Sequence, residues 1–462
     1  MMEFNEILVI AMFATFILSL FSGFPVAFVL GGIGVLFAGI GYLSDIYMDT
    51  MTGLDYLTLG LAVNRIYKVM DNWVLVALPM FVFMGLMLDE SGIAERLMGA
   101  MQRLFGRVRG GLAITVTTIG IILAASTGIV GASVVLLGLL SLPAMLSQGY
   151  SKPLALGTVA SAGTLGILIP PSIMLVIMAD QLALSVGDLF MGAVIPGLIL
   201  GTLYILYILL YGLLRPEHAP LPDDHTAVDW GVIWELFKVI LPPVGLIFAV
   251  LGSIFAGVAT ATEAAGVGAL GATLMAAYYG NLSLHVLREV LRATFNTTAY
   301  IFAIFLGATL FALVLRELGG DELISSTLTG LPFGPYGIIA FILLIVFALG
   351  FFLDWIEITL IVLPLMAPVI TELGLGINGH GIVDNPELVW FVMLVAVTLQ
   401  TSFLTPPVGF SLFYLKGVCP PEVKLTEIYR GVVPFILLQL IGLAIVASFP
   451  QLVIWLPALA YG

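Results

Sequence analysis

The sequence predicts an all-α polytopic membrane protein built as an inverted repeat, with two re-entrant helical hairpins and two discontinuous helices. Three observations lead to this fold class: the composition, two apolar stretches too long for one membrane crossing, and a Pro-Pro pair downstream of each stretch. The chain has 462 residues, of which 61% are hydrophobic and 9% are charged, and its mean hydropathy is +1.18. Because a soluble chain of this length needs far more polar surface, most of this chain is expected to lie in lipid.

The same composition argues against several other classes of protein. No strand-like alternation of about ten residues recurs, as an outer-membrane barrel would require. Four His and one Cys, Cys419, exclude a Cys-rich metal site and an internal disulfide, so we expect no transition metal. The opening MMEFNEILVI carries Glu3 and Glu6 where a cleaved signal peptide carries basic residues. The net charge of −13 reflects acidic loops, and we expect no binding of nucleic acid.

The two long apolar stretches show the same order of features. The first runs from about Gly111 to Gln148 with ASTGIVGAS at its middle, and GTLGILIPPSI follows it. The second runs from about Gly334 to Thr371 with FLDWIEIT at its middle, and TSFLTPPVGF follows it. Each stretch is nearly twice the roughly 20 residues that cross a bilayer. A long stretch and then a proline-broken helix, occurring twice, is typical of an internally duplicated secondary transporter.

The other hydrophobic runs predict further spans, some of them interrupted. The mixed segment between Asp45 and Trp73 is amphipathic and is expected to lie along the membrane interface. The Pro-rich, acidic segment Arg215–Trp230 is expected to join the two halves in water. The expected spans are Leu8–Gly23, Pro25–Tyr42, Val74–Leu88, Pro153–Ala179, Phe190–Leu214, Val239–Gly257, Thr262–Tyr279, Ala299–Leu315, Leu388–Leu415 and Val432–Ile454.

Basic residues give the expected orientation of these spans. If each hairpin returns to the side that it entered, all but Arg65, Lys68 and Arg316 of the 15 Lys and Arg fall on one side. By the positive-inside rule that side is cytoplasmic, and both termini then lie outside. An odd number of expected crossings separates the hairpins, so they enter from opposite faces, which is an inverted repeat. The alternative is that either stretch crosses the membrane twice, which scatters the basic loops over both sides.

This threading predicts five consecutive segments. Residues 1–110 form N-terminal scaffold spans and an interfacial arm, and residues 111–186 form the first hairpin with its broken helix. Residues 187–333 form scaffold spans and a central cytoplasmic loop. Residues 334–420 form the second hairpin with its broken helix, and residues 421–462 form the C-terminal span. The two hairpins and the two broken helices together are expected to form a transport domain.

The hairpin tips and the helix breaks are the candidate binding positions. Irregular backbone at membrane depth is tolerated only where it is buried in protein or lines a wet cavity. It exposes carbonyl oxygens that suit Na⁺ and helix N-termini that attract an anion. The candidate ion ligands are Ser126, Thr127, Gly128, Ser133, Gly166, Pro170, Asp354, Glu357, Thr401, Thr405 and Gly409. The candidate substrate contacts are Ser126, Ser172, Asp354, Thr359, Thr405 and Arg316.

Each candidate also has a purely structural interpretation. Ser, Thr and Gly in membrane helices commonly allow close packing, and prolines can be simple kinks. An ionised carboxylate near the bilayer centre costs roughly 3 kcal/mol or more unless it is paired or wet, so Asp354 or Glu357 is expected to ligate a cation or hold the tip. Their alternative is a short acidic turn in water between two ordinary spans. Glu263, in TATEAAG, is better explained by a capping box with Thr260, and Arg316 by an interfacial anchor.

A set of motifs spread over essentially the whole chain carries a family resemblance. The motifs are GFPVAF, LPMFVFMGLMLDESGIAERL, GRVRGGLA, STGIVGAS, LPAMLSQGYSKPLA, GTLGILIPPSI, ATEAAGVGA and SFLTPPVGF. In combination they resemble the large membrane subunit, of the DctM type, of the tripartite ATP-independent periplasmic (TRAP) transporters. Two places depart from the usual pattern, because many members show a denser Ser-Gly-Ser-Ser run and a single Asp where this chain has STGIVGAS and DWIE.

The resemblance implies an elevator-type fold of the ion-transporter superfamily, in which a transport domain moves against a scaffold. It implies Na⁺-coupled import of an organic anion, a carboxylate, across the bacterial inner membrane, with the ion-site role carried by the Ser126–Ser133 tip, Gly166–Ser172, Asp354 and Thr405–Gly409. The coupling ion is the only cofactor that it implies. It also implies two partners, a small four-span membrane subunit of the DctQ type and a periplasmic substrate-binding protein of the DctP type.

Two other functions stay open from the residues alone. The first is a self-sufficient Na⁺- or H⁺-coupled carboxylate symporter or antiporter of the same superfamily, which needs no soluble partner. The second, less favoured, is an intramembrane enzyme. All four His fall in expected loops, and no Asp-Asp pair, Ser-His dyad or zinc motif lies within an expected span. We therefore expect no catalysis.

Overall fold

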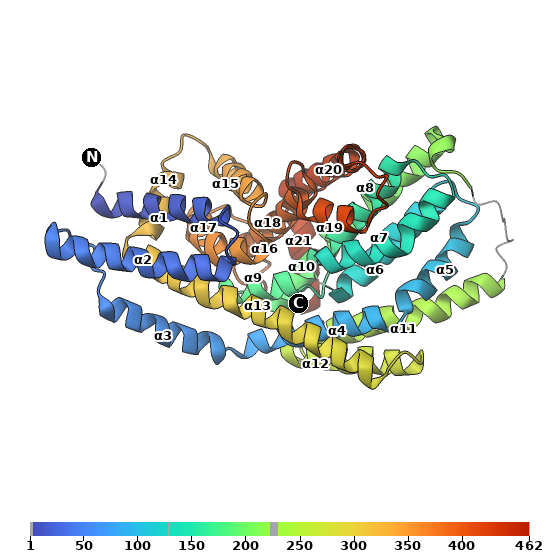
Figure 1. Cartoon of the computed structure of the whole chain (residues 1–462), viewed down its shortest axis with the longest axis horizontal. Helices are drawn as coiled ribbons and strands as arrows, with labels where there is room; N and C mark the ends of the chain where they lie inside the picture. Colours follow the sequence, from blue (N-terminus) through green and yellow to red (C-terminus); the bar gives the residue numbers. More distant parts are fainter. Residues whose placement is uncertain (1–2, 128–129, 222–229, 462) are drawn as a thin grey trace. The chain divides into compact units, whose positions relative to one another are not determined.

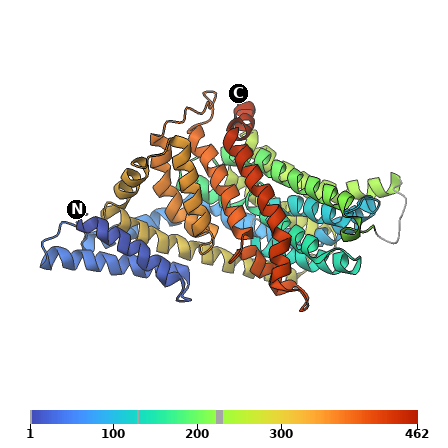
Figure 2. The same cartoon turned by 90° about the horizontal axis from the view of Figure 1, so that it is seen from above.

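Figure 1 shows the computed structural model of the chain, which describes residues 3–127, 130–221 and 230–461. Within these ranges every regular element is a helix, as the second view in Figure 2 also shows. Nine of the described helices are long and apolar enough to cross a membrane. The expected all-α polytopic membrane class is confirmed.

The helices form two compact units, each made from two separate parts of the chain. The first unit comprises residues 1–75 and 296–376, and the second comprises residues 76–295 and 377–462. The first unit contains α1 (Phe4–Leu20), α2 (Val26–Tyr47), α3 (Tyr56–Met70), η1 in part (Trp73–Val76), the second part of α13 (Leu284–Glu317), α14 (Gly320–Thr329), α15 (Pro335–Leu349), α16 (Trp355–Glu357), the π-helical turn η4 (Ile358–Val362) and α17 (Leu363–Glu372).

The helices of the second unit include the two segments that are broken at Pro170–Pro171 and at Pro406–Pro407. They are α4 (Ala77–Glu90), α5 (Ile93–Phe105), α6 (Gly111–Thr127), α7 (Val130–Ser147), α8 (Lys152–Thr164), η2 (Leu165–Ile167), α9 (Ile173–Gln181), α10 (Val186–Leu214), η3 (Pro216–His218), α11 (Trp230–Phe255), α12 (Ala261–Tyr278), the first part of α13, α18 (Pro386–Leu404), α19 (Phe410–Val418), α20 (Leu425–Ser448) and α21 (Gln451–Tyr461).

In the first unit, aromatic rings and a glycine hold α13 against α1 and α2. The ring centroid of Phe311 lies 5.8 Å from that of Phe13 and 5.4 Å from that of Phe16. Gly307 lies so close to the carbonyl of Ala27 that a Cβ at this position would overlap it. Small residues let membrane helices approach closely because van der Waals contact, and not the hydrophobic effect, drives their association.

The amphipathic segment predicted before Trp73 forms α3. Asp55 caps this helix, because its Oδ1 accepts from the backbone N–H of Thr58 at 2.8 Å. Tyr67 and Lys68 of α3 are exposed and Ala62 is buried. The polar and apolar residues of this helix segregate to different faces, so it is amphipathic as expected, and its place at the membrane interface stays a prediction.

In the second unit, α8 lies at the centre of the packing. It contacts α6 and α7 on one side and α20 on another, and every side chain from Leu154 to Thr164 is buried. A second pair, α4 and α12, packs along its length, with Gly268 of α12 against Met84 of α4. The capping box predicted at the start of α12 is confirmed, because Glu263 Oε2 accepts from Thr260 N–H at 2.8 Å and Thr260 Oγ1 accepts from Glu263 N–H at 3.3 Å.

Several helix boundaries differ from the expectation, and two of them differ most clearly. The span expected over Val432–Ile454 is two helices, since α20 ends at Ser448 and α21 begins at Gln451. Pro450 between them has no N–H to continue the helical hydrogen bonds. In contrast, α13 is far longer than the expected Ala299–Leu315 and begins at Leu284. Its first turns carry charged residues, which hydropathy excludes from a span but which a helix accommodates readily.

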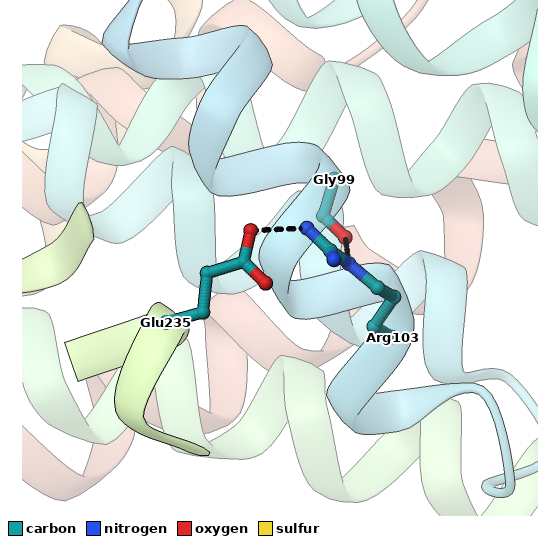
Figure 3. A network of polar contacts seen from close by, with 3 residues as sticks. All are labelled: Gly99, Arg103 and Glu235. Atoms are coloured by element: carbon teal, nitrogen blue, oxygen red, sulfur yellow. Dashed lines mark hydrogen bonds and ion pairs between the residues drawn. The ribbon is translucent and has the colours of Figure 1, made fainter. Parts of the chain in front are cut away.

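An ion pair ties α5 to α11 in the second unit (Figure 3). Arg103 Nη2 lies 2.6 Å from Glu235 Oε1, and Arg103 Nε donates to the carbonyl of Gly99 at 3.3 Å. Both charged side chains are 47% exposed. Ion pairs this exposed contribute about 1 kcal/mol or less, so this contact adds little to the stability of the fold.

Candidate functional site

The first broken helix interrupts its own hydrogen bonding within a few residues. Helix α8 ends at Thr164, the 3₁₀ turn η2 follows, and the peptide bond between Pro170 and Pro171 is cis. The second half, α9, then runs for nine residues. The hydroxyl of Ser172, which is fully buried, donates to the carbonyl of Ile167 at 2.6 Å. The side chain thus replaces part of the main-chain bonding that the prolines remove.

The second broken helix has the same construction. Helix α18 ends at Leu404, the bond between Pro406 and Pro407 is cis, and the second half, α19, again has nine residues. Gly409 has φ +53°, a left-handed conformation that glycine adopts without steric penalty. The hydroxyl of Ser411 donates to the carbonyl of Phe403 at 2.7 Å across the break. The two Pro-Pro motifs therefore mark two discontinuous helices, as the sequence predicted.

Hydroxyls of α18 also lead up to the second break. Thr401 Oγ1 donates to the carbonyl of Val397 at 2.8 Å, and Thr405 Oγ1 donates to the carbonyl of Thr401 at 2.7 Å. Each proton is directed at the backbone, so the lone pairs of both oxygens remain to face another group. A hydroxyl can ligate a cation only through its oxygen. The orientation of Thr401 and Thr405 is therefore compatible with the ion-ligand role expected for them.

The two breaks lie next to each other in the second unit. Helix α18 contacts both α8 and η2, and α19 contacts α7 and α8. One side chain joins them directly, because Gln400 Nε2 donates to Thr164 Oγ1 at 3.3 Å. Thr164 is the last residue of α8, and Gln400 lies one turn before the end of α18. The C-terminal ends of two half-helices, each with a partial negative charge, therefore meet at this contact.

Gln400 was missed by the reasoning from the sequence. It lies in the run LVWFVMLVAVTLQTSFL, just before the hydroxyls and prolines that were predicted to bind the ion. The available signal was an uncharged but strongly polar residue inside an apolar span, since polar side chains within membrane helices generally face the protein interior. The structure buries Gln400 completely.

Three glycines in or beside the first hairpin and the first broken helix lie in close contacts between helices. A Cβ on Gly163 would overlap Val134 of α7, and a Cβ on Gly157 would overlap the carbonyl of Gly431 on α20. On α7, a Cβ on Gly131 would lie 2.8 Å from the ring of Tyr414. These three glycines are therefore explained by close contact between helices, without any ligand.

The first hairpin is formed by α6 and α7, which lie side by side (Figure 1). Ser133 is buried near the start of α7. Of the other residues predicted at this tip, Gly128 lies outside the described residues, and the side chains of Ser126 and Thr127 are likewise outside the description.

The second hairpin, formed by α15 and the segment from α16 to α17, belongs to the first unit. Asp354 begins its second arm, and Asp354 Oδ1 accepts from the N–H of Trp355 at 2.8 Å. Glu357 is only 1% exposed, and its Oε2 finds no hydrogen-bond partner in the described parts of the chain. The same holds for Thr359 Oγ1 within η4. Glu357 is therefore buried within the protein, whereas Asp354 is half-buried.

Arg316 lies at the end of α13 in the first unit. Its Nε is 3.2 Å from Asp321 Oδ2, and the two side chains are 44% and 42% exposed. The side chain is therefore already paired with a neighbour at a helix end, as an anchor would be. Its predicted contact with substrate remains a prediction, as does every other ligand assignment above.

Comparisons with known proteins agree with these observations. The family model described as "Tripartite ATP-independent periplasmic transporter, DctM component" matches residues 13–452. The C4-dicarboxylate TRAP transporter large permease protein DctM of Pseudomonas aeruginosa is 30% identical over 399 residues, which cover 85% of this chain and 88% of that protein. The sialic acid TRAP transporter large permease protein SiaM of Vibrio cholerae is 28% identical over 444 residues, which cover 94% and 98%.

A solved structure shows a similar fold. The YdaH transporter of Alcanivorax borkumensis, whose crystal structure is described as having an unusual topology, aligns with a TM-score of 0.55 at 14% identity. The alignment covers 81% of this chain and 84% of that one. At this identity the likeness concerns the fold alone, and it confirms the predicted fold class.

Proposed function

The chain belongs to the DctM component family of the tripartite ATP-independent periplasmic transporters, and from this premise we propose that it imports an organic anion, a carboxylate, together with Na⁺. As a member of that family it is the large permease subunit of a secondary transporter and not an enzyme. The similar proteins are named for different substrates, a C4-dicarboxylate and sialic acid. The substrate class and the coupling ion are therefore parts of the proposal.

One observation carries the proposal: the two broken helices meet through Gln400 and Thr164. Each break ends one half-helix and begins another, so each presents carbonyl oxygens together with free N–H groups. The carbonyl ends favour a small hard cation, whereas the N-terminal ends of α9 and α19 favour a carboxylate. A cation and an organic anion that bind at neighbouring positions screen each other's charge, which favours their movement together.

The proposed ion ligands include residues near the two breaks. In the second unit, Ser133, Gly166, Pro170, Thr401, Thr405 and Gly409 would contribute hydroxyl or carbonyl oxygens. Asp354 and Glu357, which belong to the first unit, are proposed as carboxylate ligands from the sequence alone. Ser172, Thr359, Thr405 and Arg316 are the proposed substrate contacts, and Ser126, Thr127 and Gly128 are proposed from the sequence alone. Sodium fits an all-oxygen set of this kind because it is a hard cation.

We further propose alternating access by an elevator motion, with hairpins that are re-entrant from opposite faces of the inner membrane. In this proposal the transport domain comprises residues 111–186 and 334–420, and both termini lie in the periplasm. A separate four-span subunit of the DctQ type would brace the scaffold, and a soluble protein of the DctP type would deliver the substrate. The basic loops and the repeated order of hairpin and broken helix support this threading.

Reconstitution tests the proposed function. The chain would be placed in liposomes with the small subunit and with the binding protein encoded by a neighbouring gene. Radiolabelled carboxylates would then be screened with an inward Na⁺ gradient, with equal Na⁺ on both sides, and with a proton gradient alone. We expect uptake only with the Na⁺ gradient and only with the binding protein present. Uptake without the binding protein would favour a self-sufficient symporter, and uptake driven by protons alone would contradict Na⁺ coupling.

A further inference from the structure

Gln400 has an unusual environment for an amide at membrane depth. It is fully buried, and it lies in α18, a helix in which nearly every residue is buried. Its nitrogen has a partner on the other broken helix, whereas its side-chain oxygen finds none among the residues that the structure describes. A buried carbonyl oxygen without a partner is unfavourable, and most strongly so where no bulk water is present.

The hydrogen-bond network determines which way the amide faces. Thr164 Oγ1 donates its single proton to the carbonyl of Ser161 at 2.8 Å. It can therefore only accept from Gln400, and the group that faces it must be the amide nitrogen. The oxygen of Gln400 is consequently held away from Thr164, and the bond that joins the two helices fixes its direction.

The surroundings select the charge of a ligand for this oxygen. Gln400 lies where the C-terminal ends of α8 and α18 meet, and both ends carry partial negative charge. An anion would be repelled by the amide oxygen and by both helix ends. Elsewhere at the breaks, the hydroxyls of Ser172, Thr405 and Ser411 satisfy backbone carbonyls, so Gln400 offers the oxygen that still needs a positive neighbour.

We propose that the side-chain oxygen of Gln400 is a direct ligand of the coupling cation, held in place by the bond between its nitrogen and Thr164. This inference rests on the proposed function and adds a residue to its cation site. In this proposal the contact between the two broken helices helps to form the cation site, because a cation bound to Gln400 contacts both breaks at once. An amide oxygen is a ligand that hard cations such as Na⁺ accept readily.

Equilibrium binding of Na⁺ to the purified full-length chain tests this inference without any organic substrate. Isothermal titration with NaCl in a choline chloride background would be performed on the wild type and on Q400L. Loss of one ligand to a cation should raise the Kd for Na⁺ by about 10-fold to 100-fold. Q439L is the matched control, since Gln439 is an equally buried glutamine in α20, and it should leave the Kd for Na⁺ unchanged.

Two further variants separate a ligand from a purely positioning residue. Q400E keeps an oxygen at the site and adds charge but loses the donor to Thr164, and it should bind Na⁺ at least as tightly as the wild type. T164V removes the bond and leaves the Gln400 oxygen, so it should raise the Kd far less than Q400L does. If T164V and Q400L weaken binding equally, or if Q400E binds more weakly than the wild type, Gln400 is not a ligand.

The outcomes also separate this inference from the proposed function. If Q400L binds Na⁺ like the wild type, while the wild type still transports with a Na⁺ gradient, the role of Gln400 is refuted and the proposed function stands. If the wild type itself shows no binding of Na⁺ and transports with protons alone, the Na⁺ coupling and the role of Gln400 are both refuted. Should Q400L fail to fold, Q400E and T164V still decide the question.

Discussion

The contact between α8 and α20 allows the sharpest prediction about stability. Gly157 of α8 faces Gly431 of α20, and a Cβ on Gly157 would overlap the carbonyl oxygen of Gly431 and lie 2.6 Å from its carbonyl carbon. The Phe435 ring would lie 3.0 Å away. Because the groups in the way are backbone, no rotamer change relieves the overlap. We therefore expect Gly157→Ala to force the two helices apart.

The structure indicates the size of this effect. Ordinary contact between carbon atoms is about 3.5–4.0 Å, so α20 must move by roughly 1 Å along the contact with α8. A gap of that size forfeits about a quarter to a half of each dispersion contact along the interface. The lost dispersion contacts and the usual cost of overpacking a core act together. We therefore expect Gly157→Ala to lower the free energy of unfolding by about 2–4 kcal/mol.

The control is the same substitution where a methyl group has room. Gly266 lies within α12, and a Cβ there would meet nothing within 4 Å. Since alanine favours a helix over glycine by about 1 kcal/mol, Gly266→Ala should leave stability unchanged or raise it. Thermal unfolding of both purified variants in the same detergent, followed by tryptophan fluorescence, provides the comparison. Equal melting temperatures for the two variants would refute the account of this contact.

Three further outcomes are expected for transport and topology. Asp354→Asn should raise the Na⁺ concentration needed for half-maximal uptake, because one of the proposed cation ligands loses its charge; an unchanged Na⁺ dependence would count against a cation role. Thr405→Val should reduce uptake by about tenfold or more with wild-type amounts of folded protein in the membrane, and normal uptake would remove Thr405 from the site. Single cysteines placed before Gly111 and after Gln148 should react with a membrane-impermeant reagent from the same side; labelling from opposite sides would show that the first stretch crosses the membrane completely.

Local features of the sequence were enough to predict the broken helices. Proline lacks an N–H and clashes with the preceding turn, so PPS and TPP each favour an interruption of the helix, although the pair Pro242–Pro243 lies within the continuous helix α11. The structure contains both interruptions, at Pro170–Pro171 and at Pro406–Pro407. The capping box at Thr260 and Glu263 was predictable for the same reason, since all of its partners lie within four residues.

Helix boundaries were harder to predict where a polar segment is helical or where an apolar segment is not. Hydropathy missed the first turns of α13 because they are charged, and it joined α20 to α21 because the residues on both sides of Pro450 are apolar. Charged residues are good helix formers in water, and apolar residues do not prevent a proline from ending a helix. A hydropathy scale measures partition into lipid, which is a different quantity from backbone conformation.

The sequence by itself determined that this chain is a helical membrane protein, because partition into lipid depends on the residues along each segment. The repeated order of a long apolar stretch and a Pro-Pro pair also indicated two interrupted helices of similar design. The sequence also carried enough motifs to indicate the family. Only the tertiary structure decided that Gln400 meets Thr164, a residue 236 positions away, and that Gly131 and Gly163 serve close packing. Such contacts depend on which helix faces lie together, and a single glutamine or glycine in an apolar run carries no periodic signal that could indicate its partner.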